Sequence, residues 1–124
     1  MIEIIIAFIL FLVIDTPYLL YIAGDYYKNL ITNIQKSPLN IRYTGAILTY
    51  IIMSIAVKYL ILDKSKNKKD IIINSLLVGF VGYGLYDFTN YTTFTKWTLK
   101  ASILDVIWGM ILFTMVSYLT FIVL

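Results

Sequence analysis

The sequence predicts an all-α integral membrane protein, a four-transmembrane-helix bundle in a single domain of residues 1–124. Hydrophobic residues make up 60% of the chain and charged residues 14%, whereas an average soluble domain is roughly half apolar and a quarter charged. Uninterrupted apolar runs of about 20 residues are long enough to cross the hydrocarbon core as helices. A soluble domain of this length could not bury so much apolar surface, so we expect lipid to cover it.

The side-chain inventory excludes several classes of chemistry. The chain contains neither cysteine nor histidine, which removes disulfides, thiolate or imidazole catalysis and the usual zinc ligands. We therefore expect no cofactor and no metal site. The net charge is +3, but the basic residues lie between apolar runs instead of forming a patch with interleaved aromatics. The expected partner is the lipid bilayer and not a nucleic acid, and the sequence does not indicate which cellular membrane.

The first apolar run covers approximately residues 2–23. A helix of this length would reach roughly 33 Å, enough to span the hydrocarbon core. Glu3 stands near its start in place of Lys or Arg, and no small-residue cleavage pattern follows. We therefore expect a transmembrane helix that stays attached, and not a signal peptide.

A polar connection follows the first run, from Gly24 to about Arg42. Within it, Leu30, Ile31 and Ile34 recur at helical spacing. This pattern is typical of a short helix at the membrane surface, and the polar composition is equally typical of a solvated loop. Both interpretations remain open.

Three further apolar runs are predicted to be helices at approximately 43–62, 71–91 and 98–124. A charged hairpin at 63–70 separates the first two of these, and its Asp70 is placed to cap the helix that follows. Strands are excluded because lipid tolerates no open sheet edge, and because the runs are continuously apolar instead of alternating.

Basic residues do not assign the orientation in the membrane. Five lie at or beside the second loop and five at or beside the first and third loops, so the positive-inside rule favours neither side. An even number of spans nevertheless places both termini on one side, and the first and third loops on the other.

Three acids lie inside the apolar runs: Asp15, Asp87 and Asp105. An ionised carboxylate facing acyl chains at the bilayer centre costs about 2.5–3.5 kcal/mol. Each acid should therefore point into the bundle, be paired or be protonated. Helical rise places Asp15 about 13 Å and Asp105 about 10 Å from the same membrane surface. We expect all three in the same half of the membrane or at its middle.

Helical periodicity adds polar and aromatic side chains to the face of the third helix that carries an acid. Gly79, Tyr83, Tyr86, Asp87 and Asn90 fall within a sector of about 100°. This stripe begins with a small residue and ends with polar ones, which favours convergence on a neighbouring helix.

The first and fourth helices complete the predicted cluster. Asp105, Trp108 and Gly109 share a face of the fourth helix, where the glycine permits close approach of a partner helix. Pro17 comes two residues after Asp15 and can kink the first helix at that depth. We assign no catalytic residue. The candidate polar cluster, and the candidate binding site, consists of Asp15, Tyr83, Tyr86, Asp87, Asn90, Asp105 and Trp108.

Two stretches of the sequence also resemble a known family. Tyr83–Asn90 reads YGLYDFTN, Trp97 follows it, and Asp105–Gly109 reads DVIWG. These residues resemble the signature of the family named domain of unknown function 2177, and the resemblance covers nearly the whole chain. It implies a small four-helix membrane protein without an assigned activity. The chain departs from the family pattern at Tyr18, where the family tends to have Trp, and at Thr98, where many members have Pro.

Three interpretations of the polar cluster remain. The first is transport of a proton, a cation or a small solute, within one chain or across a homo-oligomer. The alternative is a structural or assembly protein whose cluster only specifies helix packing. The least favoured is a lipid-modifying enzyme, because the dense D-x-x-D type of metal spacing is absent and Asp87 and Asp105 lie on different helices.

Overall fold

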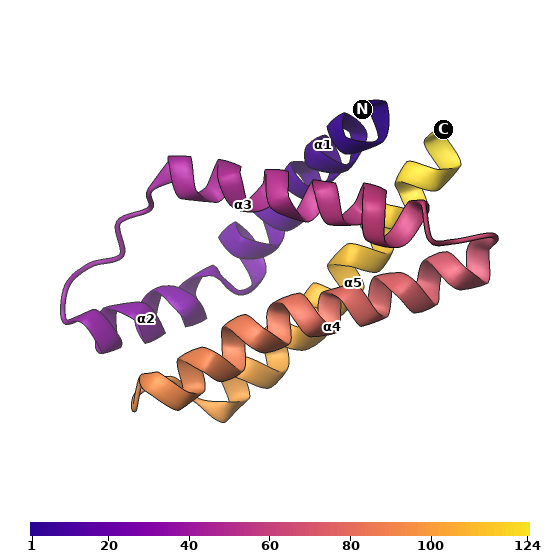
Figure 1. Ribbon diagram of the computed structural model, residues 1–124. Coiled ribbons are helices and arrows are strands. Elements are labelled where there is room, and N and C mark those ends of the chain that lie inside the picture. The colour runs from indigo at the N-terminus through magenta and orange to yellow at the C-terminus, as the bar shows by residue number, and fades with distance from the viewer.

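The computed structural model describes residues 1–124 and consists of helices joined by short connections (Figure 1). Four of its helices are long and apolar enough to cross a membrane. The predicted all-α fold with four spans is confirmed. The elements, in chain order, are α1 (Ile2–Pro17), η1 (Tyr18–Ile22), α2 (Gly24–Gln35), α3 (Tyr43–Ala56), η2 (Val57–Leu62), α4 (Lys68–Thr93) and α5 (Leu99–Val123).

Two of the four spans change their helical winding near one end. The first span is α1 continued by η1, and the second is α3 continued by η2; both continuations are π-helical. Pro17 is the last residue of α1 and has no backbone N–H to donate. Just beyond it, the Ala23 N–H donates to the carbonyl of Tyr18, five residues earlier, at 2.9 Å. The chain thus stays helical through the proline, and the helix then widens.

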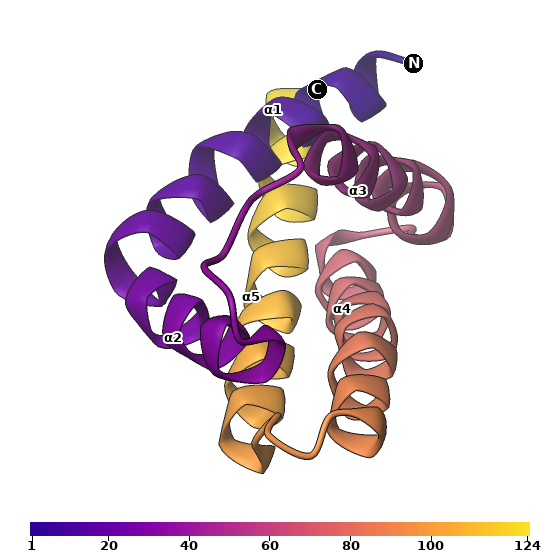
Figure 2. The same cartoon turned by 90° about the vertical axis from the view of Figure 1, so that its left-hand side faces the viewer.

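The helices pack as two pairs whose ends match the predicted topology. α4 and α5 run antiparallel along their whole length, and α1 contacts both α3 and α5. The two termini lie at one end of the bundle, and α2 and the α4–α5 connection lie at the other (Figures 1 and 2). α4 contacts η2, and from there α3 and α4 diverge toward the α2 end (Figure 1).

Glycines let α4 and α5 approach closely. A Cβ atom on Gly79 would lie 2.7 Å from the carbonyl oxygen of Gly109, and a Cβ atom on Gly109 would overlap the ring of Tyr83. Small residues at such crossings are typical of helices in lipid, where association depends on close packing because no hydrophobic driving force exists. This crossing holds the acid-bearing halves of α4 and α5 together.

Few side chains are buried within the chain itself. Only 23 of 124 residues are buried, and large apolar side chains are exposed on every span. Such an outer surface fits the lipid phase that the composition predicts. The hydrophobic core joins α1, α3, η2, α4 and α5 and consists of Ala7, Phe11, Met53, Val57, Ile61, Ile71, Leu112, Phe113 and Val116.

The polar connection after the first span forms a helix, α2, and not a plain loop. Its Leu30 packs with Trp97 and Ala101 at the start of the fourth span. Tyr27 donates a hydrogen bond from its hydroxyl to the carbonyl of Ala101 at 3.3 Å. Burial raises the pKa of the Tyr27 phenol, so the hydroxyl keeps the proton that it donates. α2 thus covers the end of α5.

The cap of α4 differs from the prediction. The helix begins at Lys68, three residues before the expected start, and Asn67 is its N-cap. The Asn67 side chain accepts the N–H of Asp70 at 2.9 Å, and the Asp70 carboxylate accepts the N–H of Lys66 at 3.0 Å. The prediction that Asp70 is the cap is wrong because Asn67 supplies the capping oxygen three residues earlier, and Asp70 lies in the first turn of the helix.

Candidate functional site

Asp15 sits where three spans meet, and both of its carboxylate oxygens are satisfied. The residue belongs to α1 and is 5% exposed. Trp108 of α5 donates from Nε1 to Oδ1 at 2.8 Å, and the Tyr50 hydroxyl of α3 donates to Oδ2. The Trp108 ring stacks on Tyr18, with ring centroids 3.8 Å apart. The acid therefore ties α1, α3 and α5 together.

Asp87 lies on α4 in a different environment. It is 0% exposed, and neither of its carboxylate oxygens accepts a hydrogen bond from a donor group. Its backbone carbonyl is held, because it accepts from the Ser102 hydroxyl at 3.1 Å. Ser102 in turn accepts from Trp97 Nε1 at 3.0 Å. The surrounding residues thus fix the backbone at Asp87 but supply no donor to its carboxyl group, whose only side-chain partner within hydrogen-bonding reach is the carboxyl group of Asp105.

Asp105 on α5 is the acidic neighbour of Asp87, and the two carboxyl groups lie within hydrogen-bonding reach, so a single proton can bridge them. It is partly exposed and lines two cavities. Unlike the carboxyl group of Asp87, that of Asp105 can therefore be reached by a small molecule. The pair brings together one fully buried acid and one accessible acid, contributed by the two helices that cross at Gly79 and Gly109.

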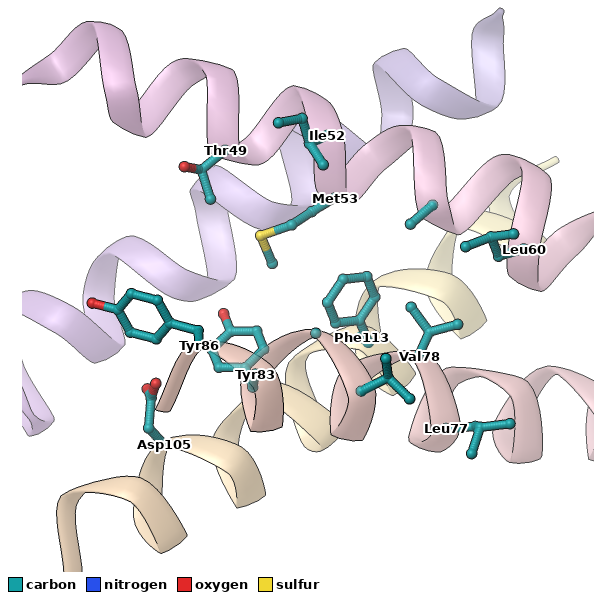
Figure 3. Close-up of a pocket in the computed structure, with 13 residues that line it drawn as sticks. Thr49, Ile52, Met53, Leu60, Leu77, Val78, Tyr83, Tyr86, Asp105 and Phe113 are labelled. Atoms are coloured by element: carbon teal, nitrogen blue, oxygen red, sulfur yellow. The ribbon is translucent and has the colours of Figure 1, made fainter. Parts of the chain in front are cut away.

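The larger cavity is a groove of about 780 Å³ between the diverging helices α3 and α4 (Figure 3). We call it the lateral groove. Ten of its 13 lining residues are hydrophobic. Leu60 and Leu77 lie at one end, and Tyr86 and Asp105 at the other (Figure 3). The full lining is Thr49, Ile52, Met53, Ala56, Leu60, Leu77, Val78, Val81, Gly82, Tyr83, Tyr86, Asp105 and Phe113.

A second cavity, of about 240 Å³, adjoins the lateral groove and reaches Asp15. We call it the inner cavity. Its wall includes Asp15, Tyr50 and Trp108, and neither cavity is lined by a lysine or an arginine. The residues that line both cavities are Thr49, Met53, Tyr83 and Asp105. Asp105 therefore stands where the lateral groove meets the cavity that reaches Asp15.

The other predicted site residues differ in where they lie. Tyr83 lines both cavities, whereas Tyr86 lines only the lateral groove and is 57% exposed. Asn90 lines neither of them. No group of three or more acidic side chains is arranged to hold a metal ion.

Residues of the second span were missing from the predicted cluster. Tyr50 bonds Asp15, and Thr49 and Met53 line both cavities. The sequence of α3 contains no charged residue, and the cluster was predicted from acids inside apolar runs, so this helix was not included. The only available signal was the position of a tyrosine and a threonine in an apolar run.

The comparison with known proteins agrees with this architecture. Residues 1–122 match the family described as "Predicted membrane protein (DUF2177)". The chain belongs to this family. The match confirms the resemblance seen at Tyr83–Asn90 and Asp105–Gly109, and the chain is accordingly a multi-pass integral membrane protein embedded in a lipid bilayer. No curated protein and no solved structure matches the chain.

Proposed function

We propose that this protein binds a proton or a small organic cation at the paired carboxyl groups of Asp87 and Asp105, as a step in carrying it across the membrane. The observation that carries the proposal is the fully buried carboxyl group of Asp87, which receives no hydrogen bond from a donor group and faces only a second carboxyl group, that of Asp105. A buried acid without hydrogen-bond donors is costly in a protein, and more so in lipid. A bound proton or cation would remove that cost.

Two features of the surroundings support this function. Neither cavity beside Asp105 contains a basic side chain, so the protein itself supplies no counter-charge there. The lateral groove and the inner cavity also meet at Asp105, which gives a cation one accessible acid before the buried one. Intramembrane acids placed in this way are typical of proton and substrate pathways.

Flux into proteoliposomes tests the proposal. Wild-type protein should increase the uptake of protons or of methylammonium above that of protein-free liposomes. The Asp87→Asn, Asp105→Asn double variant should lose most of that increase. A charge-assisted hydrogen bond is worth about 1.5–3 kcal/mol, which corresponds to binding weakened by about tenfold or more.

The matched control is Asp25→Asn, because Asp25 is an exposed acid on α2 outside the four spans. Its flux should equal that of the wild type. Unchanged flux in the double variant would remove these carboxyl groups from the mechanism.

A structural role is the second candidate function, and Asp15 favours it. Its two hydrogen bonds join three spans and give each carboxylate oxygen a donor from the protein itself. We therefore infer that Asp15 specifies helix packing. The proposed cation site consists of the other two acids.

A further inference from the structure

We infer that the lateral groove admits a single-chain amphiphile with a protonated amine head from the lipid phase, and that Asp105 binds this head. The inference rests on the proposed function, because it names the class of cation that the Asp87 and Asp105 pair would take. It assigns a second part to the site, an apolar wall for the tail of the ligand.

The lateral groove is open toward the membrane. Its walls belong to α3, η2 and α4, with Asp105 and Phe113 of α5 between them, and all four elements are parts of membrane-spanning segments. Ile52 is 66% exposed, Leu77 59% and Leu60 54%, so these walls face whatever surrounds the protein. In a bilayer that surrounding is acyl chains. A molecule can therefore enter this groove sideways, without passing through water.

The dimensions of the lateral groove suit one alkyl chain. Along α4 the groove extends from Leu77 to Tyr86, a rise of roughly 13 Å at 1.5 Å per residue. Its volume of about 780 Å³ lies within the range of ligand pockets. Because α4 is a membrane-spanning helix, a chain lying along this wall would follow the direction of the neighbouring lipid tails.

A plain hydrocarbon is a poor ligand for the lateral groove, because one end of the groove is polar. Asp105, Tyr83 and Tyr86 line that end, roughly two helical turns from the α4–α5 connection. A hydrocarbon would leave the carboxyl group without a partner, at the cost of an unpaired polar group in an apolar medium. A protonated amine would pair with it, and the tyrosine hydroxyls can accept its other hydrogens.

Photolabelling with two matched probes tests the inference. The probes are decylamine and decanol, each carrying a diazirine in mid-chain, added to the protein in phosphatidylcholine nanodiscs. Mass spectrometry then locates the labelled residues. The amine should label the groove residues Ile52, Met53 and Val81 about tenfold more than the alcohol, as expected if one ion pair distinguishes the two heads. At exposed residues outside the groove, such as Ile9 and Ile107, the ratio should be about one.

Two glycines of α4 provide a matched pair of variants. A Cβ atom on Gly82 or on Gly84 would meet nothing within 4 Å, but only Gly82 lines the lateral groove. Gly82→Phe should fill the groove and abolish the amine preference, and Gly84→Phe should keep it. Asp105→Asn should abolish the preference while leaving the groove open to both probes.

The outcomes separate this inference from the function on which it rests. Equal labelling of the groove by amine and alcohol would overturn the inference. If methylammonium flux still depended on Asp105, the cation site would stand without a lipid-like substrate. If neither labelling nor flux depended on Asp105, both proposals would fail.

Discussion

Asp15 and Asp87 are both aspartates buried within membrane-spanning helices, but their carboxyl groups meet opposite surroundings. Asp15 accepts hydrogen bonds from Tyr50 and Trp108, on two other spans. Asp87 accepts none, and its acidic neighbour Asp105 lies on a cavity wall. Burial of an acid in a membrane span therefore does not by itself indicate a ligand site. What distinguishes the two regions is whether other side chains of the protein donate hydrogen bonds to the carboxyl group.

The largest loss of stability is expected at the satisfied acid. Asp15→Ala removes two hydrogen bonds between spans, each worth about 0.6–2 kcal/mol in a membrane protein, so the free energy of unfolding should fall by about 1–4 kcal/mol. Reversible unfolding in mixed detergent micelles measures this change. Asp25→Ala on α2 is the control and should change it by less than about 0.5 kcal/mol. Equal values for the two variants would contradict the packing role of Asp15.

The second prediction concerns the crossing that holds Asp87 beside Asp105. Gly79→Ala places a methyl group 2.7 Å from the carbonyl oxygen of Gly109, and overpacking of this kind costs about 1–3 kcal/mol. Gly82→Ala on the same helix adds its methyl group to open space and should be neutral. The same unfolding assay compares them. If Gly79→Ala proved as stable as Gly82→Ala, the close approach of α4 and α5 would be refuted.

A smaller loss is expected where Ser102 fixes the backbone of Asp87. Ser102→Ala leaves the indole N–H of Trp97 without its acceptor, which should cost about 1–2 kcal/mol. Ser117 provides the control, because its buried hydroxyl has no partner. Ser117→Ala should leave the free energy of unfolding unchanged or raise it. Losses of the same size in the two variants would show that Ser102 does not bridge Trp97 and Asp87.

The smallest loss is expected when one donor to Asp15 is removed. Tyr50→Phe deletes a single interhelical hydrogen bond and should lower the free energy of unfolding by about 0.6–1.7 kcal/mol. In the Asp15→Ala background the same change should have no effect, because the acceptor is already gone. A double-mutant cycle measures this coupling. Additive effects would mean that the two residues do not interact.

The spans could be predicted from the sequence because each is a continuous apolar run. The secondary structure of α2 could not be predicted, because its polar composition fits both a helix and a loop. What decides it is the contact of Leu30 with Trp97, 67 positions further along the chain. The widening after Pro17 was missed for a related reason, since a proline predicts a disturbed helix without specifying how the winding changes.

The residues of the candidate site were predicted from their positions on single helices. Helical periodicity predicts which side chains share a face of one helix, but not which helices pack against each other. Periodicity placed Tyr83 and Asp87 on one face, but it contains no information about which spans lie opposite. The partnership of Asp15 with Tyr50 depends on how α1 packs against α3. The contrast between a satisfied and an unsatisfied acid is therefore a property of tertiary structure.

The most direct test is the free energy of unfolding of Asp87→Asn, measured beside that of Asp15→Ala in the same micelles. Asp87 accepts no hydrogen bond from a donor group, and an asparagine amide at its position can donate to Asp105, so this isosteric replacement should leave stability within about 0.5 kcal/mol of the wild type, or raise it. Asp15→Ala should lose at least about 1 kcal/mol. A loss of stability in Asp87→Asn as large as that in Asp15→Ala would show that the fold needs both acids, and would contradict the assignment of Asp87 to a ligand.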